Sequence, residues 1–199
     1  MPFLEKDIVL VGNGRSLLQR RGLGTRIDTF PIVVRFNNFS TAGFEAFVGQ
    51  KTDWWARAEN EDILPRAERL QRIVLRLQGE DSAAFQKGMQ ELVPTLRLQY
   101  PETPLEVIPR VVFTTLIEDY GFSHAPLTGT LVVAHLLHQF SRVHVCGFDN
   151  LAGTPETLRH YYSDENVIDD WTTYHEPDKE AAYLHRQVKE GRVIRLDAL

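Results

Sequence analysis

The turn Gly12-Asn13-Gly14 has the residue types of a loop that binds an anion. It follows a continuous apolar run at residues 7–11, and residues 16–21 could open a helix directly after it. Glycine lets a ligand approach the backbone closely, and the N–H groups at a helix start attract negative charge. The Asn13 amide would add a neutral donor. A plain tight turn after a strand is the alternative interpretation.

Two common nucleotide fingerprints are excluded at this turn. Leu17 stands where the dinucleotide pattern G-x-G-x-x-G needs its third glycine, and the Walker pattern is absent. An NAD-type oxidoreductase is therefore disfavoured. A second polar turn, Asn37-Asn38, ends the apolar run at residues 31–36. Asn37 either forms that turn or donates to a phosphate or a sugar hydroxyl.

Strand-like and helix-like segments alternate along the chain and must position these turns. Apolar runs predict strands at 7–11, 31–36, 72–77, 105–108, 142–146 and 192–196. Helices are predicted at 16–21, 82–98, 111–120, 128–140 and 179–190, with Ser82 and Thr128 as N-caps and Gly191 as a stop. This alternation is typical of an α/β domain whose mostly parallel sheet binds ligands beyond the carboxyl ends of its strands. Residues 49–67 and 150–178 are predicted to be irregular, substrate-facing loops.

The composition limits the class of protein. The 199 residues fit one domain, 1–199, and 43% of them are hydrophobic, enough for a core. Net charge is −5 without a basic block, which argues against nucleic acid as a partner. The single cysteine, Cys146, allows no intramolecular disulfide, and no apolar run approaches the ~20 residues of a membrane span. We expect a cytoplasmic protein without a transmembrane segment, whose substrate can still lie at a membrane surface.

Four segments, in order, resemble the motifs of the animal-type sialyltransferases, family 29 of the glycosyltransferases. The large motif resembles residues 11–14, 27–28, 34–37, 43–45 and 48–52. The small motif resembles residues 126–130 followed by 146–149. The third motif resembles His160-Tyr161-Tyr162, and the very short motif resembles His175 with Glu180 five positions later. Together these segments frame nearly the whole chain.

The resemblance implies a variant GT-A fold around a Rossmann-like sheet flanked by helices. It also implies an inverting transfer from a CMP-sugar donor to a glycan acceptor. His175 would be the catalytic base, and His160 would serve the leaving phosphate together with Tyr161. The implied donor-binding residues are Gly12, Asn13, Gly14, Asn37, Thr128, Gly129, Thr130, Gly147, Phe148 and Tyr161. Because the family's disulfide and membrane anchor are not visible, the chain resembles a short bacterial member.

The implied chemistry suits these residue types. A histidine with a pKa near neutrality can take the proton of an attacking hydroxyl. A histidine and a tyrosine can stabilise the charge that develops on a leaving phosphate. No two aspartates lie two positions apart, as they do in the Asp-x-Asp metal motif, so neither a metal nor another cofactor is expected. CMP-sialic acid and CMP-Kdo both fit as donors, and the sequence does not separate them.

The function and several residues have alternative interpretations. The alternative function is a module that only binds a CMP-sugar. His160 and His175 argue against it, because binding alone needs no base. Loop carboxylates could instead serve a glycosidase: Asp164, Glu165, Asp169 and Asp170. The neighbouring Trp54 and Trp55 either fill the core or flank a sugar. His135 and His138 could form a metal pair or simply pack on a helix, and His124 could reach the donor.

Overall fold

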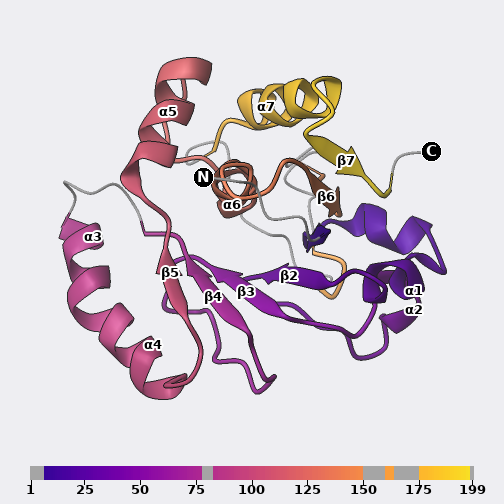
Figure 1. Ribbon diagram of the computed structural model, residues 1–199, viewed down its shortest axis with the longest axis horizontal. Helices are drawn as coiled ribbons and strands as arrows, with labels where there is room; N and C mark the ends of the chain where they lie inside the picture. The colour runs from indigo at the N-terminus through magenta and orange to yellow at the C-terminus, as the bar shows by residue number, and fades with distance from the viewer. Residues whose placement is uncertain (1–6, 78–82, 150–159, 164–174, 198–199) are drawn as a thin grey trace.

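The computed structural model describes residues 7–77, 83–149, 160–163 and 175–197. Its seven described strands form one sheet in the order β5-β4-β3-β2-β1-β6-β7, and every pairing is parallel (Figure 1). The strands are β1 (Ile8–Val11), β2 (Ile32–Phe36), β3 (Trp54–Arg57), β4 (Arg72–Leu75), β5 (Leu105–Val107), β6 (Val143–Cys146) and β7 (Val193–Arg195). The chain builds outward from β1 to β5 and then returns to place β6 on the other side of β1. The strand order therefore reverses at β1.

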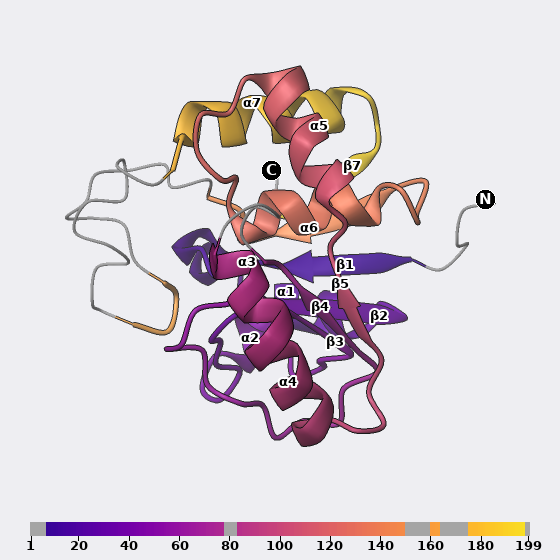
Figure 2. The same cartoon turned by 90° about the vertical axis from the view of Figure 1, so that its left-hand side faces the viewer.

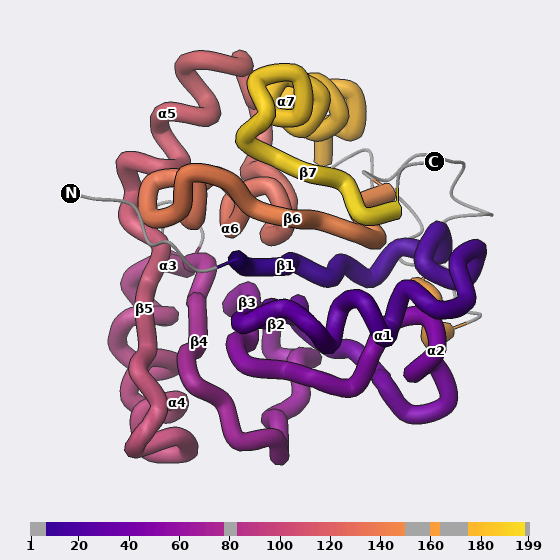
Figure 3. Tube along the Cα trace, turned by 45° about the vertical axis from the view of Figure 1, so that its right-hand side comes forward, coloured from indigo at the N-terminus to yellow at the C-terminus, as the bar shows by residue number. Residues whose placement is uncertain are grey.

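Helices cover both faces of this sheet, so the domain has three layers (Figure 2). One face carries α5 (Arg110–Tyr120), α6 (Thr128–Leu136) and α7 (Pro177–Lys189). The other carries the 3-10 helix η1 (Arg15–Gln19), α1 (Leu23–Asp28), α2 (Glu45–Val48), α3 (Ala83–Lys87) and α4 (Val93–Gln99). Figure 3 shows the same division from another direction. None of the helices in the described residues is long and apolar enough to span a membrane.

The strands are apolar because both of their faces are buried. In β1, Leu10 packs in the cluster that includes α6, whereas Val9 and Val11 pack in the cluster that includes α1. All four residues of β1 are at most 1% exposed. A period-2 alternation is therefore missing from the sequence, and the continuous run 7–11 correctly predicted such a strand.

The prediction that residues 49–67 form an irregular loop was wrong. They contain β3, which pairs with β2 and β4 at the centre of that half of the sheet. Trp54 and Trp55 are 4% and 0% exposed, so both are core residues and neither flanks a sugar. The strand was missed because its four residues, Trp-Trp-Ala-Arg, include none of the β-branched residues that mark the other strands.

Two helix predictions need smaller corrections. Thr128 is the first residue of α6 rather than its cap: Leu127 takes the N-cap position and no side chain caps the helix there. The predicted helix 82–98 is interrupted by a π-helical turn at Gly88–Leu92, and Ser82 lies outside the described residues. A Cβ on Gly88 would lie 2.6 Å from the end of the Leu77 side chain, so Gly88 packs closely against that residue just after β4. Gly191 follows the C-cap of α7 and stops the helix, as predicted, with a positive φ of 70°.

Candidate active site

The turns after β1 and β6 meet where the strand order reverses, the place at which open α/β sheets bind ligands. Gly12 N–H donates to the Cys146 carbonyl at 2.8 Å, and Gly14 N–H donates to the Gly147 carbonyl at 3.0 Å. A Cβ on Gly12 would lie 2.3 Å from the Gly147 oxygen. Glycine is therefore required at Gly12 because two backbones touch, and both turns are held as one unit.

The anion at the first helix start is an internal carboxylate. Ser16 N–H donates to Asp149 Oδ2 at 3.1 Å, and the Ser16 hydroxyl donates to Asp149 Oδ1. A Cβ on Gly14 would lie 2.3 Å from the Asp149 carboxyl carbon. The turn was predicted to bind a ligand anion, and in this structure the carboxylate of Asp149 occupies the position at the helix start. Sequence reasoning missed this partner because it lies 133 residues further along the chain.

The two predicted asparagines also serve the turns themselves. Asn13 Nδ2 donates to the carbonyls of Phe36 and Asn38, at 3.2 and 3.0 Å, which leaves its buried Oδ1 without a partner in the described residues. The donor role expected of the Asn13 amide is thus already taken in this arrangement. Asn37 adopts a left-handed φ of 47°, and its Oδ1 accepts from Ala58 N–H at 3.0 Å. Both residues line the carboxyl edge of the sheet, as predicted, and tie β1, β2 and β3 together.

Phe148 joins the first turn to the start of α6. A Cβ on Gly12 would lie 3.2 Å from one edge of its ring, and a Cβ on Gly129 would lie 3.0 Å from another. The ring also packs edge-on against Phe36, with centroids 5.7 Å apart. Phe148 is only 8% exposed. The two glycine segments predicted from distant parts of the chain therefore converge on one aromatic ring.

Glu180 connects the start of α6 to α7. Its side chain is fully buried, accepts from Leu127 N–H at 2.7 Å, and is hydrogen-bonded to the Thr130 hydroxyl. Burial raises the pKa of this carboxyl to about 7, although the two hydrogen bonds and the positive charge of Arg76 oppose the rise. The Thr130 hydroxyl thus faces α7 rather than open space, whereas Thr128 and Gly129 stay half-buried at the helix start.

His175 is held at the beginning of α7 by contacts with the 123–125 loop. The next residue, Glu176, accepts from the backbone N–H groups of Ser123 and His124 at 2.6 and 2.9 Å. These bonds and Lys179 lower the pKa of Glu176 to about 2 against the effect of its burial. His175 Nδ1 is buried and has no partner in the part of the chain that the structure describes. The imidazole is therefore anchored through its neighbours, and one ring nitrogen is not engaged.

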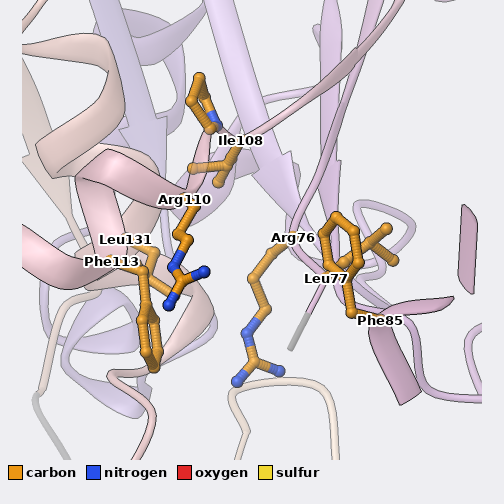
Figure 4. Close-up of a pocket in the computed structure, with 8 residues that line it drawn as sticks. Arg76, Leu77, Phe85, Ile108, Arg110, Phe113 and Leu131 are labelled. Carbon is orange, nitrogen blue, oxygen red and sulfur yellow. The ribbon is translucent and has the colours of Figure 1, made fainter. Parts of the chain in front are cut away.

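Burial lowers the pKa of His175, and the positive charge of Arg76 lowers it further, while a hydrogen bond with the Ala125 backbone opposes both effects. The imidazole is therefore neutral at pH 7, the form that can accept a proton. Arg76 follows β4 and was not singled out from the sequence. Figure 4 shows its guanidinium near that of Arg110, between Leu77 and Phe113. It was missed because one arginine after an apolar strand carries no specific signal.

His160 lies beside the turn after β1, because it forms an antiparallel bridge with Gly14. Its Nδ1 lies 3.1 Å from the Tyr162 hydroxyl, which also donates to the Asn38 carbonyl at 2.6 Å. Because that hydroxyl has a single hydrogen, we assign the ring proton of His160 to Nδ1, which leaves Nε2 as an acceptor. Burial lowers the pKa of His160.

The structure places Tyr162, rather than the predicted Tyr161, beside the ring of His160. The two rings stack with centroids 5.1 Å apart. Tyr161 is 4% exposed, donates its hydroxyl hydrogen to the Ser40 carbonyl, and packs against Phe44. The sequence could not separate two adjacent tyrosines, because only the backbone path decides which one faces the histidine.

The remaining candidates are structural or lie outside the described residues. His135 is 5% exposed and bonds to Glu106 at 2.8 Å, so it packs in the core. No cluster of three or more His, Cys, Asp or Glu side chains within the described ranges is arranged to hold a metal ion. Burial raises the pKa of Cys146 far above its ordinary value, which keeps it a thiol. The loop carboxylates Asp164, Glu165, Asp169 and Asp170 lie outside the described residues.

Comparison with known proteins agrees with this geometry. Residues 6–60 match the model of glycosyltransferase family 29 (sialyltransferase). A human CMP-N-acetylneuraminate-beta-1,4-galactoside alpha-2,3-sialyltransferase is 29% identical over 94% of this chain and 56% of its own length. A rat type 2 lactosamine alpha-2,3-sialyltransferase is 24% identical over 96% of this chain and 64% of its own length. These matches support the resemblance to glycosyltransferase family 29 that the four motifs indicate.

The fold of this chain also matches a solved structure. A mammalian sialyltransferase crystallised with Gal-beta-1-3GalNAc-ortho-nitrophenol superposes with a TM-score of 0.70 at 20% identity, over 98% of this chain and 70% of that one. The expected Rossmann-like α/β fold is thereby confirmed. The chain spans little more than half the length of the human relative.

Proposed function

We propose that this chain is an inverting, metal-independent glycosyltransferase that moves sialic acid from CMP-sialic acid to a hydroxyl of a glycan acceptor. The observation that carries the proposal is the convergence of Gly12 and Gly129 on the Phe148 ring. It joins the turn after β1 to the start of α6 at the reversal of strand order. The match of residues 6–60 to the family model and the names of the relatives support the donor class.

In this mechanism His175 accepts the proton of the acceptor hydroxyl as that oxygen attacks the anomeric carbon. The neutral state favoured by its lowered pKa suits the role of a base. The bond from the sugar to the CMP oxygen breaks, and negative charge grows on the single phosphate. The first turn of α6, whose positive dipole end lies at Thr128, would stabilise that charge. His160 would add to this stabilisation in its protonated form, in which Nε2 also becomes a donor.

The test is turnover of purified protein with CMP-sialic acid and, separately, with CMP-Kdo, each with and without a neutral β-galactoside. We expect CMP release and a sialylated product with CMP-sialic acid, also in the presence of EDTA. NMR of the product anomeric centre reports inversion. Exclusive turnover of CMP-Kdo would select the alternative donor, and turnover of neither would refute the proposal.

One substitution distinguishes the proposed transferase from a module that only binds CMP-sugars. His175→Ala is expected to abolish transfer and leave CMP affinity within about threefold, because the base is not needed for binding. His185→Ala, an exposed histidine on the same helix, is the matched control and should transfer normally. Equal CMP binding by all variants without any turnover would favour the binding module.

A further inference from the structure

A small pocket lies between the carboxyl end of β4 and the first turn of α5 (Figure 4). Leu77 and Phe85 form one apolar wall, and Phe113 and Leu131 form the other. The charged side chains that line it are Arg76 and Arg110. Its volume of about 20 Å³ suits a small polar group rather than a sugar ring.

Arg76 is incompletely paired within the described residues. Its buried Nε has no hydrogen-bond partner there, and its Nη1 lies 3.5 Å from Glu59 Oε1, at the long end of an ion pair. A buried donor of a charged group is costly when it stays unpaired. A carboxylate or phosphate oxygen would satisfy it, since the planar guanidinium fork fits both groups.

The other side of the pocket is also positive. Arg110 is the first residue of α5, an eleven-residue helix whose N-cap, Pro109, provides no side-chain cap. The N-terminal end of a helix carries partial positive charge, so a cation is unfavourable there and an anion is favourable. Two guanidinium groups and a helix start are thus gathered in one pocket of a chain whose net charge is −5.

The pocket is lined by no residue of the turns after β1 and β6, although Leu131 of α6 contributes to it. β4 is three strands away from β1, about 14 Å at the usual strand spacing. The charge of Arg76 nevertheless influences both His175 and Glu180. The charge of Arg76 therefore acts on the proposed base from a pocket whose lining includes no residue of the two interlocked turns.

We propose that Arg76 and Arg110 form a subsite for an anionic group, a carboxylate or a phosphate, carried by the glycan acceptor. This inference rests on the proposed function, because it assumes that His175 faces the acceptor hydroxyl. The subsite selects acceptors that carry negative charge next to the reacting sugar.

The test compares three β-galactosides that differ only in carrying no charge, a carboxylate or a phosphate. We expect the wild-type KM to be about tenfold or more lower for a charged acceptor, as for other hydrogen bonds to charged groups. Arg76→Gln and Arg110→Gln should remove this preference without changing the donor KM. Arg97→Gln, an exposed arginine on α4, should keep it. Arg76→Lys retains the charge and should keep part of the preference, which separates lost recognition from misfolding.

Equal KM values for neutral and charged acceptors in the wild-type enzyme would overturn the inference. An increased donor KM in Arg76→Gln would also overturn it, because the bound anion would then be the donor carboxylate. A separate NMR titration follows the Arg76 Nε–H resonance with inorganic phosphate and with acetate. A shift without turnover of any CMP-sugar would retain an anion site but refute both the acceptor assignment and the proposed function. No shift would refute the anion site itself.

Discussion

Glu180 allows the energetics of the site to be tested through the pH dependence of folding. The carboxyl is fully buried between Leu127, Thr130 and the charge of Arg76, and its pKa rises from an ordinary 4.5 to about 7. Between these two pH values the folded protein holds a proton that the unfolded chain has released. The contribution of this group to stability is therefore complete below pH 4.5 and is lost as the pH rises to about 7.

The size of the effect follows from the two pKa values. At about 1.4 kcal/mol per pKa unit, the rise from 4.5 to about 7 corresponds to about 3 kcal/mol of unfolding free energy. Glu180→Gln keeps the shape and the acceptor oxygen but cannot ionise. The stability of the wild-type protein relative to this variant should thus fall by about 3 kcal/mol between pH 4.5 and pH 7.

The assay is urea unfolding followed by tryptophan fluorescence at half-unit steps from pH 4.5 to 8. Other titrating groups act equally in both proteins and cancel in the difference. Glu118→Gln, an exposed glutamate of α5, is the matched control and should follow the wild-type curve. Parallel curves for the wild type and Glu180→Gln would refute the reasoning. A wild-type advantage that grows with pH would show that the donors and Arg76 outweigh burial.

Three further predictions concern the turns and the histidines. Gly12→Ala forces a Cβ to within 2.3 Å of the Gly147 oxygen, so we expect a loss of about 1–3 kcal/mol in urea unfolding, and unchanged stability would contradict the interlocked turns. Tyr162→Phe removes the hydroxyl next to His160 and should cost about 1 kcal/mol in the same assay; a neutral effect would argue against that hydrogen bond. The lowered pKa of His175 places the acidic limb of kcat/KM below pH 6.5, with activity lost as the pH falls, and a limb above pH 7 would exclude this base.

The sequence determined the class of fold because most strands are continuous apolar runs that can be recognised without the structure. A run such as residues 7–11 is apolar throughout since both faces of β1 are covered, and alternation with helices leaves a parallel sheet as the consistent arrangement. Gly12 was predicted to let a ligand approach the backbone, whereas the structure requires glycine there because the Gly147 oxygen lies 2.3 Å from the position of a Cβ. The sequence did not reveal β3, whose residues Trp-Trp-Ala-Arg include no β-branched side chain, unlike the other four-residue strands β1, β4 and β6.

Only the tertiary structure decided which groups meet at the site. The carboxylate of Asp149 fills the anion position of the first turn, Tyr162 rather than Tyr161 faces His160, and Arg76 comes close enough to His175 to lower its pKa. Each of these contacts joins residues whose relative positions depend on the path of the backbone. Side-chain type and spacing specify what a residue can do, whereas electrostatic and hydrogen-bond partners depend on distances of a few ångströms that are fixed only when the sheet and its two helical layers pack.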